Sequence, residues 1–339
     1  MRGPFAFDLF CGCGGLSLGM KQAGFRVLGA VDIDPLSVQT FKANHPEVEV
    51  WSEDIRALQG DAVRKRLQLR KGDLDLLAGC PPCQGFSTLR TLNGGRNIED
   101  PRNNLVFEFL RMVRELMPKA VMLENVPGLG ADRRMADFCR SLSVLGYAHR
   151  YRVLNAADFG VPQRRRRLIL LAARSGLIDY AEPCTEHPTV RTVIGSLPTA
   201  GKSGDALHDL PENRSARVME LIRKIPKDGG SRLQLARADQ LHCHLRCTGF
   251  KDVYGRMAWD APAPTITSGC YNPSKGRFLH PAEDRGITLR EAALLQSFPR
   301  DYRFPVEQGK LALASLIGNA FPPEFVRRHA ARVAAYLRN

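Results

Sequence analysis

The stretch Phe7-Asp8-Leu9-Phe10-Cys11-Gly12-Cys13-Gly14-Gly15 decides the fold of this chain, because an apolar run ends there abruptly in glycines. A helical pattern then occupies residues 16–23 and stops at Gly24, a residue type that commonly ends helices. A glycine-rich turn between a strand and a helix lets a ligand approach the backbone at the carboxyl edge of a sheet. We therefore predict a strand at residues 4–10, followed by a ligand-binding turn and a helix.

Strands and helices alternate beyond this turn. We predict further strands at residues 27–31, 74–78, 120–123 and 168–172, and helices at residues 35–44, 105–117, 289–297 and 324–337. Such alternation favours right-handed crossovers and an α/β fold with a doubly wound, mostly parallel sheet. After about residue 180 the apolar runs become short, and Pro, Gly, His and Arg become frequent. A second, smaller and irregular domain is expected there.

The composition is that of an ordinary soluble globular protein with an excess of positive charge. Of the 339 residues, 44% are hydrophobic and 25% are charged, which excludes a disordered or collagen-like chain. Lys and Arg number 49 against 35 Asp and Glu, and the resulting net charge of +14 favours a polyanionic partner such as nucleic acid. A basic but unspecialised surface is the alternative. No apolar stretch reaches the roughly 20 residues of a membrane helix, and Asp8 interrupts the first apolar run, so we expect a cytoplasmic protein with mostly reduced cysteines.

Asp32 ends the second predicted strand, about 20 positions after the glycines, where an acidic residue suits a ribose diol. Ser17 stands where a dinucleotide-binding pattern has its third glycine, and no Lys follows the glycines as in a phosphate-binding loop. A nucleoside ligand without a pyrophosphate remains, and S-adenosylmethionine fits this description. A tight turn that binds nothing is the alternative. Asp54 and Ile55, after a short third strand, are positioned to hydrogen-bond an adenine amino group.

Cys80-Pro81-Pro82-Cys83-Gln84-Gly85-Phe86-Ser87 follows the strand predicted at residues 74–78. Two prolines fix φ, so Cys83 should lie on a stiff loop at the same edge of the sheet. A free thiol has a pKa near ~8.5 and needs a positive or donor-rich setting to react as a thiolate. Three alternatives stay open for Cys80 and Cys83. The two cysteines could be buried small residues, they could be a redox pair, or they could form half of a zinc site completed by His242-Cys243-His244 and Cys247.

Two further motifs carry polar side chains at strand ends. Glu124-Asn125-Val126 ends the strand predicted at residues 120–123, where a carboxylate can act as a general acid or simply cap a turn. In Gln163-Arg164-Arg165-Arg166-Arg167, strand alternation would place Gln163, Arg165 and Arg167 on one face. Arginines at a sheet edge bind carboxylates or phosphates, unless they form a solvated basic rim.

Taken together and in this order, these motifs resemble those of the cytosine-C5 DNA methyltransferases. Two later segments, Thr288-Leu-Arg-Glu-Ala-Ala-Leu-Leu-Gln-Ser-Phe-Pro299 and Gly318-Asn-Ala-Phe-Pro-Pro323, are similar to the late motifs of that family. The resemblance covers nearly the whole chain and thins between about residues 185 and 260. Six motifs in the family order are far more specific than any one of them.

The resemblance implies a role for each matching residue. It makes Cys83 the nucleophile and Glu124 the acid that engages the base, with Arg165 and Arg167 holding the flipped cytosine and the nearby backbone. It implies S-adenosyl-L-methionine as cofactor and no metal. The implied cofactor-binding residues are Phe10, Gly12, Gly14, Asp32, Ile33, Asp54, Ile55, Pro82 and Asn319. The implied reaction is methyl transfer to C5 of a flipped-out cytosine in a specific duplex sequence, through a covalent Cys83–C6 adduct.

The resemblance also implies a domain organisation and partners. We expect a catalytic and cofactor-binding domain at residues 1–185 plus 310–339, and a target-recognition domain with the late motif at residues 186–309. The expected partner is double-stranded DNA, with no membrane and a monomeric chain. The enzyme is expected to be either the protective half of a restriction system, sharing its site with a cognate restriction endonuclease, or a solitary methyltransferase. RNA as substrate, a catalytically inactive DNA-binding module, and an NAD- or FAD-dependent oxidoreductase are the alternatives. Cys83 and Glu124 argue against the second, and Ser17 argues against the third.

Overall fold

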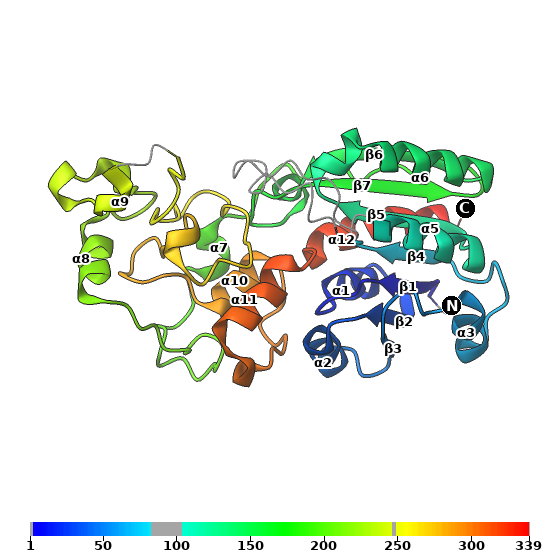
Figure 1. The fold of residues 1–339 in the computed structure, drawn as a ribbon, viewed down its shortest axis with the longest axis horizontal. Helices are drawn as coiled ribbons and strands as arrows, with labels where there is room; N and C mark the ends of the chain where they lie inside the picture. Colours follow the sequence, from blue (N-terminus) through cyan, green and yellow to red (C-terminus); the bar gives the residue numbers. More distant parts are fainter. Residues whose placement is uncertain (1–2, 83–103, 246–248, 339) are drawn as a thin grey trace. The chain divides into compact units, whose positions relative to one another are not determined.

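The structure is a computed structural model that describes residues 3–82, 104–245 and 249–338. The chain forms two compact units (Figure 1). Unit 1 comprises residues 1–159, 166–183 and 321–339, and unit 2 comprises residues 160–165 and 184–320. Each unit is described by itself.

Unit 1 is built around a mixed seven-stranded sheet with the strand order β3-β2-β1-β4-β5-β7-β6. The strands are β1 (Phe5–Leu9), β2 (Arg26–Asp32), β3 (Glu49–Ser52), β4 (Leu76–Gly79), β5 (Ala120–Asn125), β6 (Ala148–Asn155) and β7 (Arg166–Ala173). The first five are parallel, and β7 runs antiparallel to both β5 and β6. The doubly wound, mostly parallel sheet predicted from the sequence is confirmed, with one antiparallel pair of strands added at its edge.

Helices cover both faces of this sheet (Figure 1). One face is covered by α3 (Gly60–Leu67), α5 (Leu105–Leu116) and α6 (Arg133–Val144), whose apolar side chains share one core with Phe7, Leu9 and Leu77. Because side chains alternate along a strand, Asp8 must point to the opposite face. There its carboxylate accepts a hydrogen bond from Ser17 of α1 (Gly15–Gln22).

The face that carries α1 is completed by α12 (Pro323–Tyr336), the last helix of the chain, and by α2 (Pro35–Asn44). Gly19 lies at the contact between α1 and α12. A Cβ atom at this position would meet the side chain of Val326 and would lie 2.5 Å from the carbonyl oxygen of Pro323. Only glycine permits this close approach, so the two helices pack tightly although about 300 residues separate them in the sequence.

Unit 2 is irregular, as its composition predicts. Its helices are α7 (Val190–Ile194), α8 (Ala216–Lys224), α9 (His242–Leu245), α10 (Leu289–Leu295) and α11 (Gly309–Asn319). Within the described part of this unit, β pairing is limited to isolated bridges such as that between Arg256 and Leu279. The unit therefore depends on side chains that bind main-chain groups. The fully buried Arg256 donates to the carbonyl oxygens of Ile222, Ile225, His280 and Glu283.

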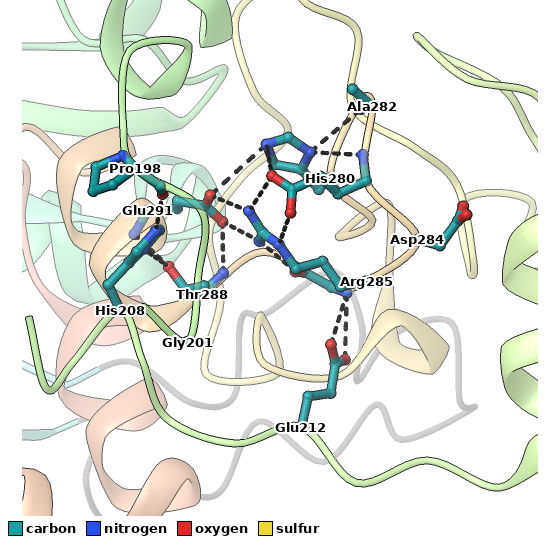
Figure 2. Close-up of polar contacts among 12 residues, drawn as sticks. Pro198, Gly201, His208, Glu212, His280, Ala282, Asp284, Arg285, Thr288 and Glu291 are labelled. Atoms are coloured by element: carbon teal, nitrogen blue, oxygen red, sulfur yellow. Dashed lines mark hydrogen bonds and ion pairs between the residues drawn. The ribbon is translucent and has the colours of Figure 1, made fainter. Parts of the chain in front are cut away.

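A buried polar network holds the segment before α10 (Figure 2). Arg285 donates to both carboxylate oxygens of Glu291 at 2.8 Å, and Glu291 also accepts from the main-chain N–H of Thr288 at 2.7 Å. The ring of His280 lies 3.8 Å from Glu291, and burial lowers the pKa of His280 to about 4. His208 contacts Thr288 Oγ1 at 2.8 Å. The late motif of the sequence is thus fixed by charged groups that are paired within the unit.

The division into units differs from the boundaries expected from the sequence at three places. Residues 160–165, 184–185 and 310–320 belong to unit 2, whereas the sequence assigned all three stretches to the catalytic domain. The physical reason is that α11 packs on α10 and that Gln163 and Arg165 bind main-chain groups of unit 2. Residues 321–339, with α12, belong to unit 1. Among the described residues, no helix is both long enough and apolar enough to cross a bilayer.

Candidate active site

The order of strands in unit 1 reverses between β1 and β4, which lie side by side in the sheet. In open α/β sheets, ligands bind at the carboxyl ends of the strands where this reversal occurs. The glycine turn follows β1, and Cys80, Pro81 and Pro82 follow β4. The two segments that the sequence singles out therefore leave the sheet next to each other.

The glycine turn has a backbone that few residues other than glycine adopt. Gly12 and Gly14 have φ angles of 53° and 97°, and Gly14 is the N-cap of α1. A Cβ atom at Gly12 would meet nothing within 4 Å, so the backbone is open on that side. Phe10 also has a positive φ of 60°, an unfavourable conformation of the kind found at functional sites.

Asp32 lies at the end of β2, beside this turn. Its Oδ2 accepts the main-chain N–H of Gly12 at 2.8 Å, and its Oδ1 accepts that of Asp34 at 2.9 Å. Burial raises the pKa of Asp32 above its usual value. Each oxygen has a second acceptor position, so the carboxylate can also bind a pair of hydroxyl groups. The neighbouring side chain of Ile33 is 63% exposed and offers an apolar surface.

Ser17, which replaces the third glycine of the dinucleotide pattern, has a structural partner. Its Oγ donates to Oδ2 of the buried Asp8 at 2.6 Å. Burial raises the pKa of Asp8 to about 8. A second acidic side chain therefore lies beneath the glycine turn, and its burial could not be recognised from the sequence. The turn, Asp32 and Ile33 together fit the adenosine part of S-adenosylmethionine.

Asp54 and Ile55 follow β3. The carboxylate of Asp54 accepts hydrogen bonds from Nε of Arg56 at 3.0 Å, and this partner lowers the pKa of Asp54. The side chain of Ile55 is buried in the core of unit 1, while its carbonyl oxygen accepts from Arg111 Nη2 at 2.6 Å. Asp54 is thus partly exposed and paired with Arg56, whereas Ile55 has a packing role.

The predicted nucleophile, Cys83, lies outside the described residues. The segment that precedes it is tied to β5, because Asn125 Nδ2 donates to the carbonyl oxygen of Pro81 at 3.0 Å. Pro82 is partly buried. The buried Asn125 of the Glu-Asn-Val motif therefore has a structural role, because it holds the main chain at Pro81, just after β4.

Glu124 is the centre of a polar cluster on the α1 side of the sheet. Oε1 of Glu124 lies 2.7 Å from Nε of Arg167, with both side chains largely buried. Glu124 pairs with Ile169 in the β5–β7 ladder, so Arg167 is its diagonal neighbour on the same face. Burial and the negative charge of Glu124 raise the pKa of the thiol of Cys80, which follows the end of β4 that is aligned with β5. This cluster is a carboxylate bound by a cation and placed beside a thiol at the ligand-binding edge.

The arginine motif alternates between buried and exposed side chains, as the sequence predicts. Gln163 and Arg165 are buried and Arg167 is partly buried, while Arg164 and Arg166 are exposed. In unit 2, Arg165 donates to the carbonyl oxygens of Ile266 at 2.9 Å and Gly318 at 3.2 Å. Gln163 Nε2 donates to the carbonyl oxygen of Leu295 at 3.2 Å.

Asn319 is exposed at the end of α11, where its side chain donates to Ser315 Oγ at 3.2 Å. It belongs to unit 2, whereas the glycine turn and Asp32 belong to unit 1.

The zinc alternative finds no support among the residues that the structure describes. No group of three or more His, Cys, Asp and Glu side chains is arranged there to hold a metal ion. Cys83 and Cys247 lie outside that part of the chain.

Comparison with known proteins finds one family of relatives for this chain. The sequence profile of the C-5 cytosine-specific DNA methylase family matches residues 6–335. The Type II methylase M.HgiDII of Herpetosiphon aurantiacus is 36% identical over 97% of this chain and 95% of its own length. The Type II methyltransferase M.XorII of Xanthomonas oryzae pv. oryzae is also 36% identical, over 100% of this chain and 86% of its own. A crystal structure of a putative prophage-encoded DNA modification methyltransferase from E. coli shares the fold, with a TM-score of 0.75 and 24% identity over 99% of this chain and 100% of its own.

Proposed function

The chain belongs to the C-5 cytosine-specific DNA methylase family, and we propose that it methylates a flipped-out cytosine through a covalent bond between Cys83 and C6 of the base. The enzyme is a DNA (cytosine-5-)-methyltransferase, and its family uses S-adenosylmethionine as the methyl donor. The observation that best supports the finer mechanism is the cluster of Cys80, Glu124 and Arg167 at the edge where the glycine turn also lies.

Cytosine C5 is too electron-poor to attack a methyl sulfonium directly. Addition of the Cys83 thiolate to C6 forms the S–C6 bond and moves the electron pair of the C5–C6 double bond to C5, which is a form of covalent catalysis. Glu124 engages N3 by donating a proton to it, which neutralises the negative charge that the addition places on the ring. When bound, S-adenosylmethionine supplies the electrophilic methyl group that C5 takes. Loss of the C5 proton to a base then re-forms the double bond and expels Cys83 as a thiolate.

Several of the described cysteines are poor competitors for this role. Burial raises the pKa of Cys13 and Cys270 to about 12 and that of Cys139 to about 11. Their thiols therefore stay neutral near neutral pH, and a thiol is a much weaker nucleophile than a thiolate. In the sequence, Cys83 directly follows Pro81 and Pro82, shortly after the end of β4.

The residues on the donor side would orient S-adenosylmethionine rather than react. We assign Asp32 to the ribose hydroxyls and Ile33 to the adenine face, and the open backbone of Gly12 and Gly14 to close approach of the ligand. Phe10, Asp54, Pro82 and Asn319 remain proposed cofactor residues, and Ile55 would act only through its main chain. Arg165 and Arg167 are proposed to hold the extruded base and the nearby backbone, with Arg167 acting through Glu124.

The substrate that we propose is duplex DNA with a specific target sequence. A cytosine stacked in a duplex is inaccessible, so the base must be extruded at a cost of a few kcal/mol. The net charge of +14 supplies phosphate contacts that offset this cost. We further propose that a monomeric, cytoplasmic chain protects DNA from a restriction endonuclease acting on the same site, since its relatives are named Type II methyltransferases. Residues 186–309 would recognise the target sequence.

The first experiment is modified-base sequencing of DNA from a methylation-deficient bacterial host that expresses the chain. The result gives the target sequence, which is then placed in a duplex with 5-fluorocytosine at the methylated position. Fluorine replaces the proton that must leave C5, so the reaction should stop after methyl transfer and leave a protein–DNA adduct that survives denaturing electrophoresis.

C83S should form no adduct and should retain duplex binding, and C139S serves as the matched control. An adduct that persists in C83S, or that maps to Cys80 by mass spectrometry, would overturn the mechanism. Methylation of tRNA in place of duplex DNA would contradict the proposal that duplex DNA is the substrate.

A further inference from the structure

Cys80 lies opposite Glu124 at the ends of two neighbouring strands. In the parallel pair of β4 and β5, Gly79 is aligned with Leu123. The next residue of each strand therefore continues the alignment, and the side chains of Cys80 and Glu124 project to the same face of the sheet. That register brings the thiol of Cys80 beside the carboxylate of Glu124, near enough for the negative charge of Glu124 to act on the thiol.

The chemistry of the pair sets the direction of a hydrogen bond between them. A carboxylate oxygen that carries no proton only accepts, so the thiol of Cys80 must be the donor. Burial raises the pKa of Cys80 well above its usual range, and the negative charge of Glu124 raises it further. Asp8, from β1, acts on the same thiol in the same direction, and the positive charge of Arg167 opposes it only partly. Cys80 is thus kept as a neutral donor and is not a second nucleophile.

The carboxylate of Glu124 then has neighbours from two different strands. Arg167 Nε binds Oε1 from β7, and the thiol of Cys80 lies beside the carboxylate at the end of β4. Two carboxylate oxygens have about four acceptor positions, so both partners can stay in place while the group engages a base. With Arg167 alone, the carboxylate would be held at one point and could rotate about that contact.

We infer that Cys80 is a positioning residue for Glu124, whose thiol donates to the carboxylate and fixes the orientation in which it meets N3 of the target cytosine. This inference rests on the proposed role of Glu124. It separates the two cysteines of the Cys80-Pro81-Pro82-Cys83 motif by function. Cys83 would form the bond to the base, and Cys80 would act through Glu124 without touching the base.

The test compares C80A, which removes the donor, with C80S, which keeps a donor of similar size. C139A is the control, since Cys139 is a partly buried thiol on α6. Single-turnover methyl transfer is measured on the duplex found by modified-base sequencing, together with KM for DNA and donor affinity by calorimetry. Loss of one hydrogen bond to a charged group predicts that C80A lowers the rate constant by roughly 10-fold while both affinities stay within about twofold. C80S should restore the rate to within about threefold, and C139A should match the wild type.

Two results would overturn the inference. C80A could match the wild-type rate, or C80S could be as slow as C80A, and either would leave the thiol with only a packing role. Melting temperatures of the variants show that each is folded before its rate is compared. Trapping with 5-fluorocytosine keeps the two proposals apart. If the wild type forms no adduct at Cys83, the proposed mechanism fails, whereas an adduct at Cys83 with a normal C80A rate contradicts only the role of Cys80.

Discussion

The main-chain N–H of Gly12 donates to Oδ2 of Asp32 at 2.8 Å, which links the turn after β1 to the last residue of β2. This contact fixes the distance between the glycine backbone and the carboxylate of Asp32 at the end of β2. A ligand that binds both groups therefore meets a site that is already assembled. Because the protein groups are already in place, less conformational entropy is lost when the ligand binds, and the affinity for the ligand is higher.

Replacement of Asp32 tests the donor site. D32A should weaken S-adenosylmethionine binding by roughly 10- to 100-fold, because hydrogen bonds to a charged group are lost. D32N, which keeps an acceptor for the N–H of Gly12, should show a smaller loss. Calorimetry measures the affinities, and D61A on the exposed start of α3 is the control. An affinity for D32A equal to that of the wild type would remove Asp32 from the site.

Duplex binding should depend steeply on salt. If about six phosphates are neutralised by the basic surface, log K should fall with log salt concentration at a slope near −5. Fluorescence anisotropy with a labelled duplex between about 50 and 200 mM salt measures this slope. A slope close to zero would mean that the excess of Lys and Arg does not contact the phosphates.

Exchange of residues 186–285 should change the methylated sequence. This segment lies within unit 2 and departs in composition from the rest of the chain. We expect a chimera that carries the corresponding segment of a relative to methylate the target of that relative. Modified-base sequencing gives the outcome directly. A chimera that keeps the original target would show that other residues choose the sequence.

The stability of unit 1 should fall on acidification through His329. This residue of α12 is 1% exposed and packs against the rings of Phe159 and Phe325. Burial disfavours its charged form and lowers the pKa of His329 to about 4. The unfolded chain, with a histidine pKa of about 6.5, binds the proton first, so stability is present above about pH 6.5 and is lost toward pH 4.

The loss at full protonation is about 3 kcal/mol for this one group. Urea unfolding of the wild type and H329F at about pH 7.5 and pH 5 separates its contribution from those of His45 and His280, whose pKa values burial also lowers to about 4. H329F, which keeps an aromatic ring, should lose less stability between the two pH values. Equal losses in both proteins would contradict the assignment to His329.

Local signals in the sequence predict the first half of unit 1 well. The predicted helix at residues 35–44 coincides with α2, because Asp34 caps it by accepting from the N–H of Ser37 and Pro35 occupies its first turn. The predicted strand at residues 4–10 contains β1, whose ends are set by Pro4 and the glycine turn. Capping residues, prolines and glycines act on their immediate neighbours, so the sequence alone reveals them.

The edge of the sheet could not be predicted in the same way. β6 carries Arg150 and Arg152, and its exposed side chains include Tyr151 and Val153, so no buried apolar face marks it as a strand. Charged residues on an edge strand prevent pairing with another sheet, which explains why this strand lacks an apolar pattern. The reversed direction of β7 is likewise decided by pairing with β5 and β6, not by its own residues.

The contacts of the candidate site depend on pairing between distant segments. The sequence predicts Glu124 and Arg167 as site residues, but their ion pair follows from the β5–β7 register and the Cys80 contact from the β4–β5 register. The main-chain contacts of Arg165 with Ile266 and Gly318 join segments more than 100 residues apart. No periodic pattern in the sequence records such pairs.

The contact of Gly19 with α12 has a consequence for synthesis of the protein. The helix that begins at the glycine turn is complete at residue 22, but its partner helix ends only at residue 336. At ribosomal rates of about 5–20 residues per second, α1 waits roughly 15–60 s for the surface that buries it. During that time all of unit 2 emerges, and unit 1 is still open on the face that carries Asp8 and Asp32. The packing of α1 on α12 therefore forms only after α12 has been synthesised, so unit 1 completes this face later than almost every other part of the chain folds.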